Sequence, residues 1–451
     1  MNQRLNALLA VIACGLVPPA TALAQFPAPT YGWNLGNTLE PPSGEGTWNN
    51  PAVTQPMINA VAEAGFNTIR IPVAWDSHAN QTTHVINASW LNRVKQVVDW
   101  SLAAGLTVVV NDHWDGGWLE NNIGNSVNPT INAKMNAYWT QIANTFAGAS
   151  YDERLLFAAA NEPNADTVAE MSTLSSYYQT FVNAVRGTGG SNTSRWLVVQ
   201  GPNTNIDLTN SLMNTLPNDP TDNRLAVEVH YYDPWQFAGL GEDANWGDMF
   251  YFWGQDYHST TLPNRNATHS EEDWLVSQLQ KMNSKFVSQG VPVILGEFGA
   301  MNRTGNPELT GADLDLHRAS RLYYHQLIVD TANSLGISPF YWDNGFTGMN
   351  GSGIFNRNSA TVFDQDTVDA LTGGAGVPGD FNDDGVVDAT DYTVWRDGLG
   401  SVYTELDYDD WKANFGASRP GGGSAAVPEP AALLLCGLIL PLAARLRLTR
   451  R

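Results

Sequence analysis

The length, composition and charge of this chain exclude several classes of function. Its 451 residues exceed one ordinary domain, although a large α/β domain can use about 250 residues or more. One large domain with small appendages is therefore expected. The formal net charge of −22 offers no basic surface to phosphates, and an acidic surface repels nucleic acid and anionic lipid headgroups. We expect a neutral substrate and no nucleic-acid partner.

The N-terminal segment, residues 1–24, is typical of a secretory signal peptide. Arg4 precedes an apolar run over 8–17, and Ala22-Leu23-Ala24 suits signal peptidase. Export is expected, with a mature start near Gln25. The only cysteines are Cys14, in this signal, and Cys436, near the other end. The body between them has no disulfide framework, so its stability must come from a buried core.

Residues 25–371 form the predicted catalytic domain, which repeats a short β-branched apolar run, a polar loop and an amphipathic stretch. This alternation is typical of α/β proteins. Candidate strands are 31–35, 68–73, 107–112, 155–161, 196–200, 225–230, 291–297 and 338–342. Candidate core-facing helices, with apolar residues three and four apart, include 91–104, 132–146, 274–289 and 313–335. Eight such units close most economically into a parallel (β/α)8 TIM barrel.

A doubly wound open sheet would show the same alternation, so the positions of the polar residues decide between the two folds. In a barrel, functional groups gather where strands end at the carboxyl face. Six polar or aromatic residues fall at such ends, on five predicted strands: His113, Asn161, Glu162, His230, Glu297 and Trp342. Scattered buried polar residues would not share one edge, which favours the barrel.

Two glutamates at distant strand ends have the chemistry of glycosidic bond hydrolysis. That reaction needs a proton donor for the leaving oxygen and a second carboxylate across the sugar ring, about 5 to 5.5 Å away in a retaining enzyme. Glu162 stands in Asn161-Glu162-Pro163, and Glu297 precedes Phe298 at another strand end. For an arbitrary glutamate, a surface or salt-bridged role is the usual alternative. The apolar strand before each residue argues against that alternative here.

The two carboxyl groups are expected to differ in pKa. Glu162 follows an apolar strand, where desolvation would raise its pKa so that it holds a proton near neutrality. Glu297 must stay ionised to attack carbon, and that requires hydrogen-bond donors. The candidate donors are Arg70, His230 and Tyr232, each near a predicted strand end.

Seven motifs, in order along the domain, resemble glycoside hydrolase family 5, the cellulase family. They are Gly32-Trp33-Asn34-Leu35-Gly36-Asn37-Thr38, Thr68-Ile69-Arg70-Ile71-Pro72-Val73, Asn111-Asp112-His113, Asn161-Glu162-Pro163, Val229-His230-Tyr231-Tyr232, Gly296-Glu297-Phe298-Gly299 and Tyr341-Trp342-Asp343-Asn344-Gly345. A single Asn-Glu-Pro motif would be weak evidence for the resemblance, but the seven motifs occur in order and span nearly the whole predicted barrel. The resemblance implies that Glu162 is the acid/base and Glu297 the nucleophile, with no cofactor for catalysis.

The resemblance also implies roles for the substrate-binding residues. Arg70 would orient the nucleophile, Asn161 would contact the substrate 2-hydroxyl, and Trp342 would form an aromatic floor for the reacting sugar. That sugar would be held by His113, His230 and Tyr232. The structural alternatives are a buried salt bridge for Arg70, hydrogen-bonded positions in the core for His113 and His230, and core packing for Trp342. The chain departs from many relatives by carrying Trp114 where they have a second histidine.

The same resemblance points to an endo-β-1,4-glucanase, with xyloglucanase, lichenase or endo-β-mannanase activity as alternatives on the same machinery. Sixteen tryptophans exceed the usual needs of a core, and sugar faces stack on such rings. Candidate subsite rings on predicted loops are Trp118, Trp235, Trp246 and Trp253. The rival from another class is a noncatalytic carbohydrate-binding surface protein, against which the two intact glutamates argue.

After a Gly-rich linker at 372–379, the segment 380–416 has the pattern of a calcium loop followed by helices. The predicted calcium ligands follow the spacing of an EF-hand loop, with side-chain oxygens at five positions and the backbone carbonyl at Val386: Asp380, Asn382, Asp384, Val386, Asp388 and Asp391. Gly385 stands at position six, where the sharp turn requires it, so an acidic linker is the weaker alternative. Aspartate rather than glutamate at position twelve resembles a type I dockerin.

A dockerin has two such loops, whereas this segment repeats only the helix. Residues 391–400 are echoed by 407–416, and only 401–406 lie between them. We therefore predict one Ca²⁺ in a small α-helical calcium-loop appendage. The missing second loop argues against cohesin binding of the usual dockerin kind. A cohesin-like or cell-surface partner and a folded spacer near the cell surface are the two alternatives.

The end of the chain is predicted to be a second processing segment, beyond a linker at 417–427. Residues 428–451 begin Pro428-Glu429-Pro430 and continue with an apolar run and terminal arginines. This order resembles a PEP-CTERM sorting tail, with a plain membrane anchor as the alternative. The run is shorter than the ~20 residues of a spanning helix. We expect secretion or retention at the cell surface or periplasm, with membrane contact only through this tail.

Overall fold

The computed structural model describes residues 30–373, 379–382, 386–399, 403 and 405–417. The predicted signal peptide, the predicted sorting tail and Asp384 lie outside the described residues. The chain divides into two compact units, Met1–Thr372 and Gly373–Arg451. Within the described part of the chain, no helix is long and apolar enough to cross a membrane.

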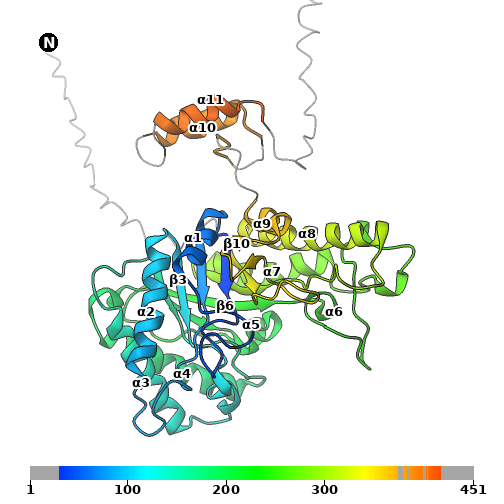
Figure 1. The fold of residues 1–451 in the computed structure, drawn as a ribbon. Coiled ribbons are helices and arrows are strands. Elements are labelled where there is room, and N and C mark those ends of the chain that lie inside the picture. The colour runs from blue at the N-terminus through cyan, green and yellow to red at the C-terminus, as the bar shows by residue number, and fades with distance from the viewer. Residues whose placement is uncertain (1–29, 374–378, 383–385, 400–402, 404, 418–451) are drawn as a thin grey trace, which may run out of the picture. The chain divides into compact units, whose positions relative to one another are not determined.

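The first unit is a closed eight-stranded parallel barrel (Figure 1). Its strands run in sequence order around the barrel: β1 Gly32–Leu35, β2 Thr68–Ile71, β3 Thr107–Asn111, β4 Leu155–Ala158, β5 Leu197–Gln200, β6 Leu225–Tyr231, β7 Val293–Phe298 and β8 Ile337–Asp343. Closure is made by β1 against β8, where Gly32 pairs with Phe340 and Leu35 with Asp343. The predicted (β/α)8 TIM barrel is therefore confirmed, and the open-sheet alternative is excluded.

Alternating residues of the strands fill the barrel interior with apolar side chains. On β4, Leu156 and Ala158 belong to an inner cluster, whereas Leu155 and Phe157 join the larger core between strands and helices. The inner cluster consists of Val109, Leu156, Ala158, Trp196, Val198, Ala226, Ile294 and Phe340. This period of two follows from strand geometry. It places every second residue of a strand inside the barrel, with the last ones at the mouth.

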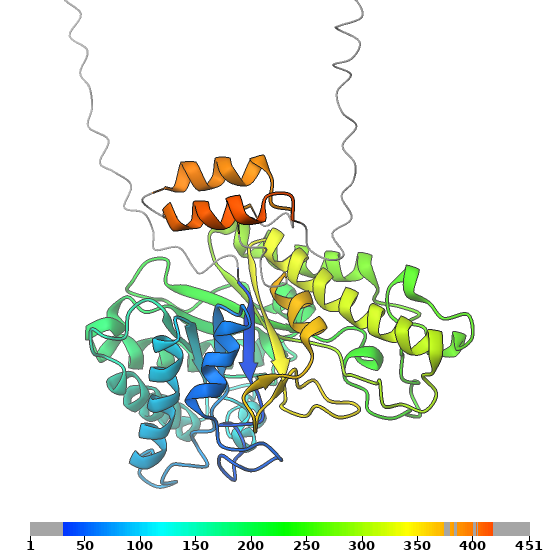
Figure 2. The ribbon, with the colours of Figure 1, turned by 45° about the horizontal axis from the view of Figure 1, so that its top comes forward.

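Helices surround the barrel, as the turned view shows (Figure 2). The α-helices of this unit are α1 Gln55–Glu63, α2 Ala88–Ala103, α3 Pro129–Thr145, α4 Val168–Gly187, α5 Ile206–Leu212, α6 Trp235–Ala238, α7 Glu272–Lys285, α8 Gly311–Ser334 and α9 Gln365–Thr372. Short 3-10 turns lie between them, and a two-stranded hairpin is formed by β9 Phe355–Asn356 and β10 Thr361–Val362. On α2, the buried residues Trp90, Val94, Val97, Val98 and Ser101 form one face, as expected of a helix that covers a barrel.

Helices α2 and α3 each begin three residues before their predicted starts, because polar side chains cap their first turns. Asn87 accepts a hydrogen bond from the backbone N–H of Ser89 at the start of α2. Asn128 does the same for Thr130 at the start of α3, where Pro129 occupies the first helical position. Caps of this kind satisfy free N–H groups of the first turn. Apolar spacing alone does not detect them.

Strand β4 ends at Ala158, three residues before its predicted end at Asn161. The backbone N–H of Ala160 donates to Oε1 of Gln200, not to a strand carbonyl. The ladder therefore ends and the chain turns to present Asn161 and Glu162 at the barrel mouth.

The longest connection on the mouth side of the barrel runs between β6 and α7 and contains α6. It is anchored by the buried guanidinium of Arg303, which donates to the carbonyls of Gln236, Phe237 and Leu240 at 3.1, 3.2 and 2.7 Å. A buried guanidinium needs such acceptors. This anchor fixes the short helix that carries Trp235.

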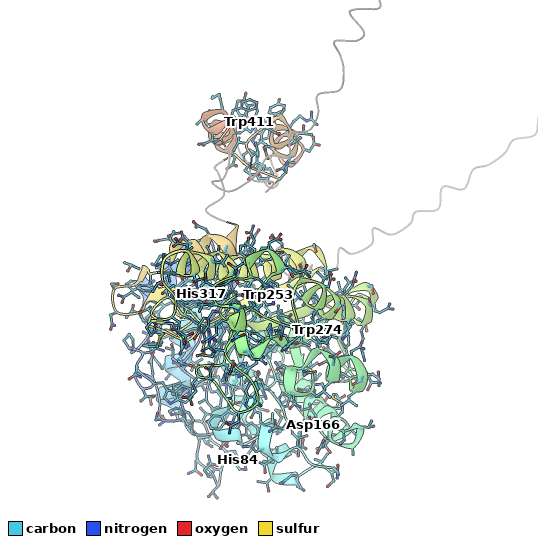
Figure 3. All side chains as sticks on the ribbon, turned by 90° about the vertical axis from the view of Figure 1, so that its right-hand side faces the viewer. His84, Asp166, Trp253, Trp274, His317 and Trp411 are labelled. Carbon is cyan, nitrogen blue, oxygen red and sulfur yellow. The ribbon has the colours of Figure 1, made fainter. Side chains whose placement is uncertain are left out.

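The second unit is a pair of helices, α10 Ala389–Gly398 and α11 Glu405–Asn414. Asp388 caps α10 in a reciprocal capping box with Asp391. The residue before the capped start of α10 is joined to the residues after α11, because the N–H of Val387 donates to the carbonyl of Ala417 and its carbonyl accepts from the N–H of Gly416. Trp411, labelled in Figure 3, donates its indole N–H to the carbonyl of Asp388 at 2.7 Å.

The aspartate predicted as the last calcium ligand holds the calcium-loop segment together through backbone amides. Oδ1 of Asp391 accepts from Phe381 and Asn382 at 2.8 and 3.0 Å, and Oδ2 accepts from Asp388 at 2.7 Å. Among the described residues, the only three potential ligand side chains whose atoms converge are Glu162, His230 and Glu297, in the barrel. The described loop residues thus form a closed turn, and the calcium site remains a prediction.

Candidate active site

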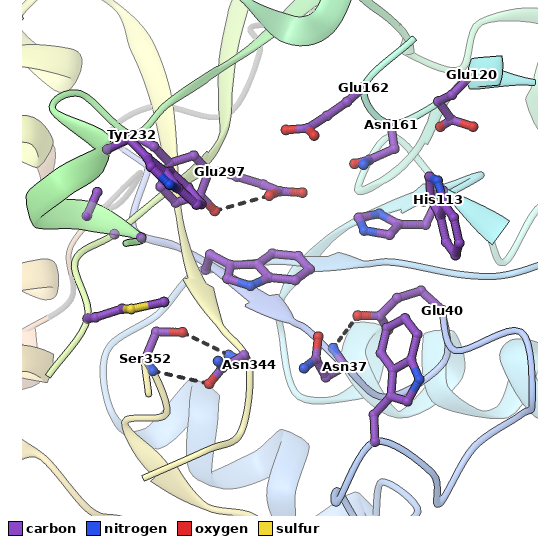
Figure 4. A pocket seen from close by; sticks show the side chains of 18 of the residues that line it. Asn37, Glu40, His113, Glu120, Asn161, Glu162, Tyr232, Glu297, Asn344 and Ser352 are labelled. Atoms are coloured by element: carbon purple, nitrogen blue, oxygen red, sulfur yellow. Dashed lines mark hydrogen bonds between the residues drawn. The ribbon is translucent and has the colours of Figure 1, made fainter. Parts of the chain in front are cut away.

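The barrel opens at the carboxyl ends of its strands into a cavity of about 550 Å³. Six of the eight residues predicted for the active site line it: His113, Asn161, Glu162, Tyr232, Glu297 and Trp342. The other two, Arg70 and His230, are buried side chains that contact the lining carboxylates. Figure 4 shows Glu162 and Glu297 facing one space from different strands. The structure therefore brings together all eight predicted residues.

The two carboxylates are close enough to act on one sugar ring. Carboxylate oxygens of Glu162 and Glu297 lie within 4.8 Å of one another, together with a ring nitrogen of His230. A separation near 5 Å leaves no room for a water between nucleophile and sugar, whereas inverting enzymes need about 6.5 to 9.5 Å. The geometry fits direct attack by one carboxylate on carbon.

Glu297, on β7, is enclosed and held by two donors. Nη1 of Arg70 lies 2.8 Å from its Oε1, and the hydroxyl of Tyr232 donates to its Oε2 at 3.1 Å. Its side chain is only 7% exposed. Both oxygens are thereby fixed in direction, as a nucleophile that must attack along one line requires.

The guanidinium of Arg70 contacts side chains that come from four other strands of the barrel or from the residues that directly follow them. It is completely buried and donates to Oδ1 of Asn34 at 3.0 Å and to Oδ1 of Asn161 at 2.9 Å, besides its contact with Glu297. Its Nε lies 2.9 Å from Oε1 of Glu228. The predicted contact between Arg70 and Glu297 is therefore present, and the salt-bridge alternative is also realised, with Glu228 as the second partner.

Glu162 occupies the more open side of the site. Its Oε1 lies 2.8 Å from Nδ1 of His230, while 47% of its side chain is exposed. His230 is itself buried between this carboxylate and Glu228, whose Oε1 is 3.2 Å from its other ring nitrogen. An open acid/base next to an enclosed nucleophile suits a reaction in which a leaving group departs and water enters on the same side.

The pKa difference predicted for the two glutamates is reversed in the structure. Although burial opposes it, the hydrogen bond and charge of His230 lower the pKa of Glu162. Burial raises the pKa of Glu297, against the charges of His230 and Arg70. The sequence-based expectation was wrong because it considered only the apolar strand before Glu162 and not the imidazole at the strand end of β6.

His230 holds the proton that Glu162 was expected to hold. Although burial opposes it, the carboxylates of Glu297, Glu162 and Glu228 raise the pKa of His230 to about 9. Interacting groups this close share their protons, so the His230–Glu162 pair is best treated as one unit with one proton. Along the 2.8 Å contact, that proton can pass to Glu162 when a leaving oxygen requires it.

His113 and Trp342 form the part of the cavity wall predicted to bind the reacting sugar. Their rings stack in parallel, with centroids 5.6 Å apart and planes inclined by 6°. Nδ2 of Asn111 lies 3.1 Å from Nδ1 of His113. Burial, followed by the charges of Arg70 and His230, lowers the pKa of His113 well below its usual range. His113 is thus a neutral imidazole that accepts one hydrogen bond.

Only part of the predicted aromatic lining is exposed. Trp118 and Trp253 are buried in the core, so these two are packing residues. Trp235 is exposed and lines the cavity, while Trp246 is exposed but is not among the lining residues. Two further exposed tryptophans in the cavity wall, Trp48 and Trp114, were not predicted as ligand contacts.

Three buried carboxyl groups around the site were also missed. Glu40 and Glu120 line the cavity, and burial raises the pKa of each, to about 7 and about 8 respectively. The third is Glu228, two residues before His230 on β6. Its signal in the sequence was an acidic residue at alternate spacing within an otherwise apolar strand, a position that faces the barrel interior.

Comparison with known proteins assigns the family. Residues 30–348 match the family model described as cellulase, glycosyl hydrolase family 5. The chain belongs to this family, and it is therefore a glycoside hydrolase, as the motifs and the barrel indicated.

Individual relatives cover the barrel in sequence and structure. Endoglucanase A of Paenibacillus barcinonensis is 38% identical over 372 residues, which span 76% of this chain and 87% of that protein. A family 5 xyloglucan-specific β-1,4-glucanase from a ruminal metagenomic library, solved with a bound XXLG ligand, matches with a TM-score of 0.69 and 40% identity over 76% of this chain and 93% of that one. The family 5 xyloglucanase from Paenibacillus pabuli matches with a TM-score of 0.69 and 38% identity over 76% and 98%.

Proposed function

We propose that this protein is a retaining endo-β-1,4-glucanase that uses Glu297 as nucleophile and Glu162 as acid/base. The observation that carries the proposal is the separation of at most 4.8 Å between their carboxylate oxygens. The contacts of Arg70 and Tyr232 with Glu297 support it. So do the endoglucanase and β-1,4-glucanase names of the relatives.

The reaction proceeds in two displacements at the anomeric carbon. A Glu297 oxygen attacks that carbon while Glu162 donates its proton to the glycosidic oxygen, which leaves as a sugar hydroxyl. The glycosyl group is then bound to Glu297 as an ester. In the second step Glu162, now ionised, removes a proton from water, whose oxygen attacks the same carbon and releases Glu297. Configuration is retained because inversion occurs twice.

Xyloglucanase activity is the second candidate, and a specific observation favours it. The two solved structures described above are named as a xyloglucan-specific glucanase and a xyloglucanase. A branched glucan needs an open binding cleft, and the cavity wall of this protein carries three exposed tryptophans, Trp48, Trp114 and Trp235, on which sugar rings can stack. Lichenase and endo-β-mannanase activities have no comparable support among these matches.

The decisive assay compares purified wild type with Glu297→Ala on carboxymethyl cellulose, barley β-glucan, xyloglucan and mannan. Wild type should release reducing ends from at least one β-1,4-glucan, and the variant should fall to the assay background. Equal release by both proteins would refute the catalytic assignment and favour a noncatalytic binding protein. Wild-type activity on mannan alone would refute the glucanase assignment.

We further propose that the segment 380–391 binds one Ca²⁺. Its carboxylate, amide and backbone oxygens are the donors that calcium prefers, and the closure of the described turn by Asp391 brings the ends of the loop together. Calorimetric titration of the whole chain with calcium should give one site, which Asp384→Ala should abolish. Two sites, or none, would contradict the proposal.

The ends of the chain support a proposed location outside the cytoplasm. Residues 1–24 would direct export and 428–451 would retain the protein at the cell surface or in the periplasm. The dockerin-like segment would then contact a cohesin-like or cell-surface partner. The test is fractionation of cells that express either the whole chain or a chain ending at 427. The whole chain should be found in the envelope, and the shortened chain should be found in the medium. Identical distributions would contradict a sorting role for the tail.

A further inference from the structure

A single buried carboxylate touches the supports of both catalytic glutamates. Glu228 lies on β6, two residues before His230. Because alternate residues of a strand face the same side, both side chains face the barrel interior, and Glu228 lies deeper in it. It is completely buried. Oε1 lies 2.9 Å from Nε of Arg70 and 3.2 Å from Nε2 of His230. Those two residues in turn contact Glu297 and Glu162, each at 2.8 Å.

The second oxygen of Glu228 extends the same connection to the strand that carries Glu162. Oε2 accepts a hydrogen bond from Nε2 of Gln200 at 2.6 Å. Oε1 of Gln200 accepts from the backbone N–H of Ala160 at 2.9 Å, two residues before Glu162. All partners of this carboxylate are thus groups that position the reacting carboxylates.

The neighbouring strand is shaped to admit this carboxylate. A Cβ atom on Gly296 would lie 2.0 Å from Oε1 of Glu228. Real Cβ atoms do not approach an oxygen so closely, so the residue before the nucleophile has to be glycine while Glu228 stays in place. The glycine of the Gly296-Glu297 motif is therefore explained by a residue that is 68 positions earlier.

We propose that Glu228 is a positioning residue that aligns Arg70 and His230, and through them holds the nucleophile and the acid/base at the correct positions relative to each other. This inference rests on the proposed function of Glu297 and Glu162. Without Glu228, two buried cations would lose a shared anion, and removal of one partner from a buried ion pair is costly. The imidazole of His230 would then be free to turn away from Glu162.

The charges around His230 define how its proton should respond. Glu162, Glu228 and Glu297 face it with negative charge, while Arg70 is a cation close by and His113 is neutral. The phenol of Tyr178 and the amide of Gln200 are the uncharged groups beside Glu228. Loss of the Glu228 charge leaves one fewer anion to stabilise the imidazolium. The His230–Glu162 pair should therefore release its proton at a lower pH.

The test compares wild type with Glu228→Gln, which keeps the shape and removes the charge. We expect the kcat of this variant to fall about 10²-fold with little change in KM, as misalignment near the reacting atoms does. The basic limb of kcat/KM should move to lower pH by about one unit, the usual effect of one nearby charge. Glu228→Asp, which keeps the charge but shortens the side chain, should lower kcat while its basic limb stays near that of wild type.

The matched control is Asp219→Asn, which removes one carboxylate from the buried ion pair with Arg186, away from the cavity. Both side chains of that pair are 5% exposed and lie 2.6 Å apart. This control should lose stability but keep the kcat and both pH limbs of wild type. If Glu228→Gln shares that outcome, with an unmoved basic limb, Glu228 is only structural and the inference is wrong.

Two further outcomes keep the inference testable. Should Glu228→Gln fail to fold, the aspartate variant decides, and a wild-type kcat in Glu228→Asp would overturn the inference. Failure of the proposed function is distinguishable, because it would appear as hydrolysis retained by Glu297→Ala, whatever the behaviour of the Glu228 variants.

Discussion

The proton used by the acid/base is shared with His230 in the free enzyme, and this determines the expected pH profile. The profile of kcat/KM should be bell-shaped. Its acid limb reports protonation of Glu297, whose pKa lies above the ordinary value of 4.5 because of burial. Its basic limb reports loss of the proton from the His230–Glu162 pair, in which the pKa of His230 is about 9.

Replacement of His230 separates this interpretation from one in which Glu162 acts alone. In His230→Asn the proton must be held by Glu162 itself, so the basic limb should move to lower pH. The measurement is a set of initial rates across pH on a soluble glucan. A basic limb that stays near the wild-type position would show that His230 does not hold the proton.

The role of Glu162 predicts a dependence on the leaving group. Glu162→Ala should slow hydrolysis of a polymeric glucan about 10² to 10⁴-fold, the usual contribution of general acid catalysis. The first step on an aryl glycoside with an acidic phenol should be impaired far less, because that leaving group needs no proton. A burst of released phenol by rapid mixing would measure this step. Equal impairment with both substrates would contradict the assignment.

At the scale of single residues, the sequence could predict which side chains meet but not how they share charge. The eight predicted residues converge because strand ends of a barrel must converge. The pKa order of Glu162 and Glu297 depends on a 2.8 Å contact with His230, which no strand pattern specifies. Glu228 was missed for a related reason, since its partners come from β2 and β5 as well as from its own strand.

Among the helices, α2 offers a direct test of how polar caps set the element boundaries. Asn87→Ala removes the acceptor for the backbone N–H of Ser89 and should lower the free energy of unfolding by about 1 kcal/mol. Denaturant unfolding at fixed pH measures the change. Asn136→Ala, at an exposed position inside α3, is the control, because alanine favours a helix interior and should not destabilise it. Equal destabilisation by both would show that the cap is not the cause.

The elements themselves were largely predictable, because eight β-branched apolar runs mark eight buried strands. The residues at which these strands and helices begin and end were less predictable. The end of β4 depends on the Gln200 side chain, which takes the N–H of Ala160 from the ladder. The beginnings of α2 and α3 depend on Asn87 and Asn128, polar residues that lie outside the apolar repeat.

For the whole molecule, the boundary between the two units predicts where the chain can be shortened. Helix α9 belongs to the first unit, since Val368 and Leu371 are part of the barrel core. A chain ending at Thr372 should keep the activity and melting temperature of the barrel. One ending at Asp364, which lacks α9, should melt at a lower temperature, because the loss of a single buried leucine side chain from a core costs about 2 to 5 kcal/mol.

Calorimetry of the two shortened chains and of the whole chain, with the signal segment removed from all three, measures this difference. Identical melting of both shortened chains would show that α9 does not stabilise the barrel. A large loss of stability in the longer of them would show that the second unit is needed for folding of the first.

The unequal exposure of the two glutamates has a consequence for the fate of the covalent intermediate. Once the leaving chain has departed, the ester on Glu297 remains enclosed, while Glu162 faces solvent with nearly half of its side chain, 47%. Any hydroxyl that reaches this open face can be deprotonated in place of water. In concentrated oligosaccharide, the enzyme should therefore extend chains by transglycosylation, and products longer than the supplied substrate should appear early in the reaction.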